Sequence, residues 1–184
     1  MNIGILGSGN VAQVLGNGYL AKGHEVMLGT RDASKLAEWL KNAGASASVG
    51  SFEDAAKFGE IVFLSVHANA IDAVIELAGK DHFNGKILID LSNPMDFADG
   101  VPPKFTATVG NSLGERVQRS LPDANVVKAF NSIGIAVMTE PKFGAETATH
   151  FIAGDNDAAK AQATKLIEEF GWDVIDVGGI EQSF

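Results

Sequence analysis

The sequence contains no cysteine, few basic residues and no long apolar run, and each shortage excludes a class of protein. Without cysteine the chain can form no disulfide, no thiolate metal site and no cysteine nucleophile. Its 14 lysines and arginines stand against 23 acidic residues, and the net charge of −9 excludes the basic footprint of a nucleic-acid-binding protein. No cluster of basic residues suggests an anionic membrane surface, and no apolar run approaches the length of a transmembrane helix.

Size and rhythm favour a single α/β domain. The 184 residues suffice for one domain with a full core, and the composition is even, so we predict one domain over residues 1–184. About eight short strand-like runs alternate with helical patterns, which predicts a doubly wound, mostly parallel sheet covered on both faces. Because an apolar strand begins at residue 2, we expect no signal peptide, and hence a cytoplasmic enzyme or sensor.

The chain opens with a glycine turn between a strand and a helix. Residues 2–6 have the apolar character of a buried strand, and the Gly7-x-Gly9-x-x-Ala12 spacing matches the fingerprint of dinucleotide-binding βαβ units. Gly7 permits the tight turn, Gly9 leaves room for a pyrophosphate, and Ala12 lets helix and sheet pack closely. The positive end of the helix that begins near Asn10 would hold the phosphate charge. A glycine turn that serves packing alone is the alternative.

The residues after the second strand, expected from His24 to Leu28, indicate which nucleotide binds. NAD-binding folds usually end this strand with an acidic residue that accepts a hydrogen bond from the ribose 2′-hydroxyl. Thr30 and Arg31 stand there instead, and a hydroxyl beside a guanidinium suits a 2′-phosphate, so the sequence predicts NADP(H). Alternatively, Arg31 is a solvated loop cation, and Asp32 takes the ribose role or only caps the next helix. Lys35 would add a second positive charge, although such a lysine is more often solvated.

The most apolar run, residues 60–66, predicts a central strand that delivers His67 to the rim where doubly wound sheets bind ligands. With the strand order 3-2-1-4, this rim lies beside the glycine turn. His67 would contact the cofactor's ribose or act as a general acid; equally, it would cap a helix from Ala70 to Lys80. Metal-ligand spacing is absent elsewhere, so no metal site is expected. The histidines without an assigned role are His24, His82 and His150.

The segment from residue 93 to residue 110 has no regular period. Loops of this length are uncommon in compact domains and are usually lids or binding loops. Its prolines and its exposed-looking aromatic residues, Phe97 and Phe105, argue against a disordered excursion, because such side chains need something to pack on. A later strand would place Asn131 on the same rim as Asn93.

Capping residues predict where several helices begin. Residues 51–54 have the pattern of a capping box, and Asp155-x-Asp157 is expected to cap a helix from residue 158 to residue 170. If Asp32 is a cap, its helix runs from residue 33 to residue 42.

Four motifs read together resemble one family. They are Gly7-Ser8-Gly9-Asn10-Val11-Ala12, Gly29-Thr30-Arg31, Ser92-Asn93-Pro94 and Val126-Val127-Lys128-Ala129-Phe130-Asn131. Their combination resembles the NADP oxidoreductase, coenzyme F-420-dependent family, which also includes the cytoplasmic oxidoreductase domain of the STEAP metalloreductases. The resemblance covers essentially the whole chain. It implies a single Rossmann-like domain with extra strands, whose type members pass a hydride between NADPH and a deazaflavin or flavin.

The resemblance also implies roles for individual residues. The implied contacts are Ser8, Asn10 and Val11 for the pyrophosphate, Thr30 and Arg31 for the 2′-phosphate, Ser65, Val66 and His67 for the central riboses, and Asn93, Pro94, Ala129, Phe130 and Asn131 for the nicotinamide. The implied acceptor is coenzyme F-420, FMN or FAD, and a homodimer is compatible with the resemblance.

Two other functions compete with this one. An NADP(H)-sensing or binding module would keep the nucleotide site and lack an acceptor of its own. The absence of an obvious catalytic dyad does not decide the matter, because hydride transfer between two bound rings needs little acid–base machinery. A reductase of small imines or carbonyls would need a helical second domain.

Overall fold

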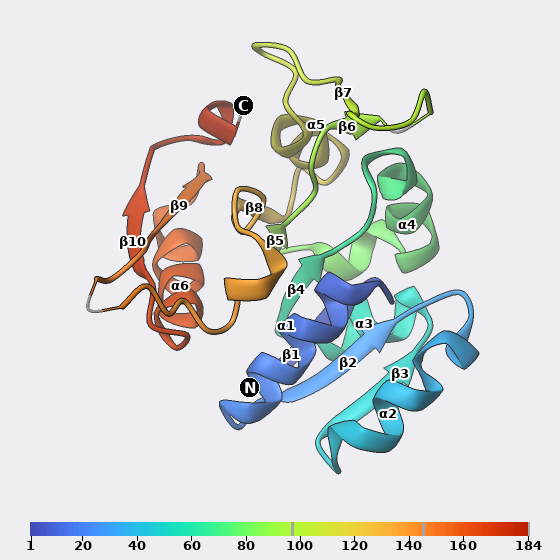
Figure 1. Cartoon of the computed structure of the whole chain (residues 1–184). Coiled ribbons are helices and arrows are strands. Elements are labelled where there is room, and N and C mark those ends of the chain that lie inside the picture. The colour runs from blue at the N-terminus through green and yellow to red at the C-terminus, as the bar shows by residue number, and fades with distance from the viewer. Residues whose placement is uncertain (97, 145, 184) are drawn as a thin grey trace.

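The main feature of the fold is one eight-stranded sheet with the order β10-β9-β8-β5-β4-β1-β2-β3 (Figure 1). The computed structural model describes residues 1–96, 98–144 and 146–183. Neighbouring strands pair in parallel except β8 and β9, which are antiparallel. The predicted Rossmann-like, mostly parallel sheet is therefore confirmed, including the 3-2-1-4 order around the glycine turn.

The elements are short. The sheet strands are β1 (Asn2–Leu6), β2 (Glu25–Gly29), β3 (Ala47–Gly50), β4 (Ile61–Leu64), β5 (Ile87–Asp90), β8 (Asn125–Lys128), β9 (Thr149–Gly154) and β10 (Asp173–Asp176). The α-helices are α1 (Asn10–Ala21), α2 (Ala37–Ala43), α3 (Phe52–Phe58), α4 (Ile71–Ala78), α5 (Leu113–Ser120) and α6 (Asp157–Glu168). The 3-10 turns are η1 (Ala33–Leu36), η2 (Ala68–Ala70), η3 (Lys80–Phe83), η4 (Ile135–Val137) and η5 (Ile180–Ser183). Across the described residues, no helix combines the length and apolarity that crossing a bilayer requires.

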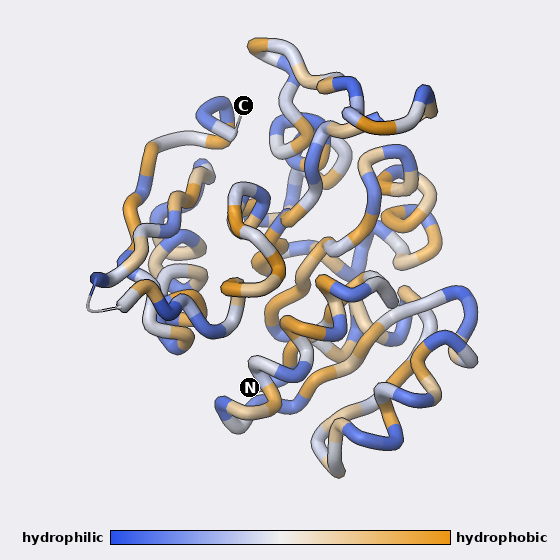
Figure 2. The backbone as a smooth tube through the Cα atoms, in the orientation of Figure 1, coloured by the Kyte–Doolittle hydropathy of each residue, from blue (hydrophilic) through white to orange (hydrophobic). Residues whose placement is uncertain are grey.

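Helices cover both faces of the sheet because successive strand residues point to opposite sides. Ile5 and Phe63 belong to the cluster that packs against α1, α2 and α6. Leu64 and Leu88 belong to the cluster on the other face, against α3, α4 and α5. In Figure 2 the apolar colouring concentrates along the central strands. Burial of both faces explains why these strands are continuous apolar runs rather than alternating ones.

Two predicted caps are confirmed. The hydroxyl of Ser51 accepts from the Asp54 backbone N–H while the Asp54 carboxylate accepts from the Ser51 backbone, which completes the capping box of α3. The carboxylate of Asp32 accepts from the Ser34 backbone N–H at 3.0 Å. The helix expected after Asp32 is nevertheless divided, because η1 is a 3-10 turn and the α-helical geometry begins only in α2.

The predicted cap of the last helix is wrong. Asn156, not Asp155 or Asp157, has the extended backbone of an N-cap, and its side-chain oxygen accepts from the Ala159 N–H at 3.0 Å. Asp155 accepts instead from the backbone of Ile180 at 2.8 Å. Asp157 is the first helical residue, where its charge still favours the positive helix end.

The predicted loop after β5 is partly ordered. Its strands β6 (Met95–Asp96) and β7 (Lys104–Phe105) form an antiparallel pair, so the expectation of no regular structure is wrong for these residues. Strands of two residues are too short for a period to appear in the sequence. Phe105 is 65% exposed, as expected, and Phe97 lies outside the described residues.

Candidate functional site

A cavity of about 490 Å³ lies along the carboxyl ends of β1, β2, β4 and β5. The predicted site residues that line it are Gly7, Ser8, Gly9, Asn10, Val11, Thr30, Arg31, Lys35, Ser65, Val66, His67 and Asn93. The remaining lining residues are Asp32, Phe52, Ala70, Val74, Leu91 and Met95. The strand order reverses between β1 and β4, and the carboxyl edge at such a point is where doubly wound sheets bind ligands.

Gly7 and Gly9 occupy the turn for different structural reasons. Gly7 has φ +150°, and a Cβ there would lie 2.2 Å from the Ser65 carbonyl oxygen, so only glycine fits. Gly9 has an ordinary extended backbone, with φ −77° and ψ 177°. A Cβ on Gly9 would meet nothing within 4 Å. The protein itself therefore does not need glycine at this position, and the missing side chain leaves space at the cavity wall for a ligand.

The N-terminus of α1 faces this cavity without a capping side chain. Its N-cap is Gly9, no side chain accepts from its first N–H groups, and its first turn holds no acidic residue. By contrast, Ser51 and Ser112 cap α3 and α5 with complete capping boxes. Unpaired N–H groups and the positive end of a helix dipole together bind anions. This end of the cavity is thus suited to a phosphate.

The Thr30-Arg31 end of the cavity carries accessible positive charge. The Thr30 hydroxyl accepts from the Asp32 backbone N–H at 3.2 Å. The Asp32 carboxylate accepts from both the hydroxyl and the backbone N–H of Ser34, and these bonds hold its pKa below the usual range. Arg31 and Lys35 are both exposed, and both line the cavity together with Asp32.

His67 does not cap the following helix with its side chain. Its backbone carbonyl accepts from the Ala70 N–H at 2.9 Å, but no side-chain cap bond forms. The alternative of a helix-capping imidazole is therefore wrong, because the backbone makes the cap. The helix begins as the 3-10 turn η2, and α4 starts at Ile71. The exposed imidazole instead lines the cavity.

The residues expected near the nicotinamide meet at the ends of β5 and β8. The Asn93 Nδ2 donates to the Asn131 carbonyl at 2.9 Å, so the structure brings these two segments together. Of these residues, Asn93 lines the cavity, while Pro94 is buried and Ala129 is fully buried. Asn131 is half-buried and contributes its backbone oxygen to the contact with Asn93.

A strained backbone lies beside Asn131. Phe130 has φ +63°, a left-handed conformation that is rare for an aromatic residue. Its N–H donates to Nε2 of His150 at 2.8 Å, and both residues are buried. Burial lowers the pKa of His150 to about 4, so at neutral pH the ring is the neutral acceptor that this bond needs. Sequence reasoning gave His150 no role, since a histidine within a strand carries no local signal.

The part of the chain that the structure describes contains no group of histidine, aspartate or glutamate side chains able to hold a metal ion. The polar groups that line the cavity are helix N–H groups, hydroxyls, amides, the His67 imidazole, two cationic side chains and the Asp32 carboxylate. This donor set suits a phosphorylated nucleotide.

Comparisons with known proteins identify the family of this chain. The family model for NADP oxidoreductase, coenzyme F420-dependent, matches residues 2–94. The F420-dependent NADP reductase of Methanocaldococcus jannaschii is 31% identical over 176 residues, which cover 89% of this chain and 78% of that protein. Metalloreductase STEAP3 of Rattus norvegicus is 30% identical over 179 residues, which cover 97% of this chain but only 34% of that protein.

A solved structure shares nearly the whole fold. It is a candidate F420-dependent NADP reductase from Arthrobacter sp. FB24, with a TM-score of 0.92 and 34% identity over 98% of this chain and 86% of that one. On these matches, this chain belongs to the NADP oxidoreductase, coenzyme F420-dependent family of NADP-dependent oxidoreductases.

Proposed function

We propose that residues 1–184 form a single NADP(H)-binding domain that transfers a hydride between NADPH and a deazaflavin, or a flavin, as acceptor. The observation that carries the proposal is the cavity, because it joins the uncapped N-terminus of α1, Thr30-Arg31 and Asn93 along one edge of the sheet. The empty space beside Gly9 and the absence of acidic residues in the first turn of α1 suit a pyrophosphate.

In this proposal the cofactor's parts follow the order of the strands. Ser8, Asn10 and Val11 would bind the pyrophosphate, and Thr30, Arg31 and Lys35 the 2′-phosphate. Ser65, Val66 and His67 would contact the central riboses, and Asn93 and Asn131 would border the nicotinamide. Pro94 and Ala129, which are buried, would only support these two residues. NADPH, when bound, supplies the hydride, while the chain's own residues bind and orient it.

The hydrogen bond to Asn131 fixes the orientation of the Asn93 side-chain amide. Its Nδ2 donates to the Asn131 carbonyl, so its side-chain oxygen is left as an acceptor at the cavity. A nicotinamide carboxamide carries an NH₂ donor. Asn93 would therefore orient the ring through one amide-to-amide hydrogen bond, with its own orientation set in advance by Asn131.

The β6–β7 hairpin supports an acceptor site beside the nicotinamide end. Met95 lines the cavity and pairs directly with Phe105, so the two side chains share one face of the hairpin. Both are exposed, at 38% and 65%. The Thr106 backbone and hydroxyl each donate to the Pro94 carbonyl, at 2.8 and 3.0 Å, and hold the base of the hairpin. An exposed thioether beside an aromatic ring suits a planar ring system such as a deazaflavin.

Nucleotide titration tests the cofactor. We expect NADPH to bind more tightly than NADH, and Arg31→Ser to weaken NADPH by roughly 10- to 100-fold, since a charge-assisted contact contributes about 1.5–3 kcal/mol. Arg116→Ser, which removes an exposed arginine of α5, is the matched control and leaves both affinities unchanged. Equal affinity of the wild type for NADPH and NADH would refute the assignment of the 2′-phosphate to Thr30 and Arg31.

Stopped-flow mixing tests the acceptor. NADPH-loaded protein is mixed with coenzyme F420, FMN or FAD, and oxidation of NADPH is followed by absorbance. Phe105→Ser is expected to slow hydride transfer without changing NADPH affinity, whereas Phe151→Ser, at an exposed phenylalanine of β9, leaves both unchanged. If the protein binds NADPH but none of the three acceptors oxidises it, the NADP(H)-sensing module replaces the oxidoreductase as the favoured function.

A further inference from the structure

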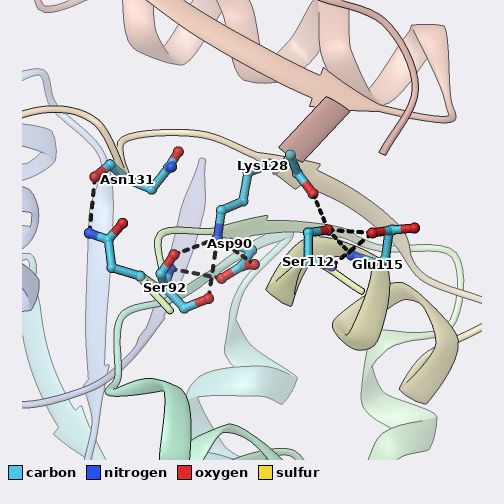
Figure 3. Close-up of polar contacts among 8 residues, drawn as sticks. Asp90, Ser92, Ser112, Glu115, Lys128 and Asn131 are labelled. Carbon is cyan, nitrogen blue, oxygen red and sulfur yellow. Dashed lines mark hydrogen bonds and ion pairs between the residues drawn. The ribbon is translucent and has the colours of Figure 1, made fainter. Parts of the chain in front are cut away.

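A buried ion pair joins the ends of two neighbouring strands. Asp90 and Lys128 are the last paired residues of β5 and β8, and the Lys128 Nζ lies 2.9 Å from an Asp90 carboxylate oxygen (Figure 3). Their side chains are 0% and 4% exposed. Neither residue lines the cavity.

The pair binds the chain immediately before Asn93. The Lys128 Nζ donates to the Ser92 carbonyl at 2.5 Å and to its hydroxyl at 3.2 Å. The second oxygen of Asp90 accepts from the Ser92 backbone N–H at 2.8 Å. Three polar groups of Ser92 are thus held by two buried charges, as Figure 3 shows. Residue 92 can move only if these bonds break.

The same pair is tied to the segment after β8. The Ala129 N–H donates to the Asp90 carbonyl at 3.1 Å, and two residues later the Asn131 carbonyl accepts from Asn93. The ion pair at the base and the amide contact at the rim close one loop of hydrogen bonds between the two segments. His150 holds the left-handed turn at Phe130 within that loop.

The cost of burying charge argues for a role beyond packing. The residues directly before Asp90 and Lys128 are the buried apolar Ile89 and Val127. Well-packed apolar residues often serve stability as well as a buried ion pair does, or better. What an ion pair adds is geometry, since its hydrogen bonds are satisfied in one arrangement.

We propose that Asp90 and Lys128 are positioning residues that hold Ser92 so that Asn93 is locked onto Asn131 and the nicotinamide end of the cavity is preorganised. The inference rests on the proposed function only in assigning NADPH to this cavity. It assigns no contact between the ion pair and the cofactor.

The test compares two ligands that differ at the nicotinamide end. NADPH and 2′,5′-ADP, which lacks the nicotinamide, are titrated against the wild type and against the double variant Asp90→Leu/Lys128→Met, in which both charges are replaced. We expect the double variant to bind 2′,5′-ADP as the wild type does and to lose roughly 10-fold or more in NADPH affinity, because the reacting end of the site is misplaced. Its melting temperature is expected to fall, because the buried N–H, carbonyl and hydroxyl of Ser92 lose their partners, so both titrations are made at a temperature where the variant is folded.

A double-mutant cycle assigns the effect to Asn93. Asn93→Ala alone should lower NADPH affinity, and adding it to the double variant should lower that affinity little further, because the ion pair acts through this side chain. Lys160→Met is the matched control: Lys160 is a second buried lysine, paired with Asp176 at the far edge of the sheet, and its loss should leave the ratio of the two affinities unchanged.

Two results would overturn the inference: an unchanged NADPH affinity in the double variant, or an equal loss for both ligands, which would make the pair a part of the fold alone. Should the double variant not fold, Ser92→Ala removes only the hydroxyl contact to Lys128. It should shift the affinity ratio in the same direction by a smaller factor, and an unchanged ratio would equally refute the inference. If the wild type binds neither ligand, the proposed function fails instead.

Discussion

His150 should make the protein less stable in mild acid. Its Nε2 accepts from the Phe130 N–H, so the folded state holds the neutral ring, and burial lowers its pKa from 6.5 to about 4. As the pH falls through 6.5, His150 is protonated in the unfolded chain but stays neutral in the folded chain. The resulting loss of unfolding free energy is absent above pH 6.5, grows down to pH 4 and is then constant. It reaches about 3 kcal/mol in full, and about 2 kcal/mol at pH 5.

This loss of unfolding free energy is measured by urea denaturation of the wild type and His150→Gln at pH 7.5 and pH 5, followed by circular dichroism. Between the two pH values the wild type should lose about 2 kcal/mol more than the variant. Phe151→Gln, at a half-exposed position of the same strand, keeps the imidazole and should keep the wild-type pH dependence. If His150→Gln loses as much stability as the wild type on acidification, the folded state does not hold His150 as a buried neutral acceptor.

Three further substitutions have defined outcomes. Gly7→Ala should cost about 2 kcal/mol or more in urea denaturation, because the new Cβ meets the Ser65 carbonyl at positive φ, and a smaller loss would contradict the rigid turn. Gly9→Ala should leave that stability unchanged yet weaken NADPH in titration, and unchanged affinity would mean that no phosphate lies there. Ser51→Ala should cost about 1 kcal/mol through loss of the capping box with Asp54, and a melting temperature equal to the wild type's would argue against it.

Features that depend on neighbours along the chain could be predicted from the sequence. The alternation of strands and helices, the Gly7–Gly9 turn, the Thr30-Arg31 pair and the capping box at Ser51 all follow from local steric and hydrogen-bonding preferences. Local preference also explains the errors. Asn156 lies between two aspartates, and all three residue types are good N-caps, so local preference does not decide which of them caps α6. The strands that contain Met95 and Phe105 are two residues long, which is too short for a period to appear in the sequence.

The sequence by itself determined the α/β class and predicted the candidate nucleotide site near the N-terminus, because both depend on short-range sequence patterns. The tertiary structure alone decided which distant residues meet. Asp90 and Lys128 are 38 residues apart, and Phe130 and His150 are 20 residues apart. In the sequence, nothing distinguishes any of these four residues from an ordinary strand residue. Pairing of β5 with β8, and of β8 with β9, buries them together, and burial is what turns a lysine or an imidazole into a specific partner.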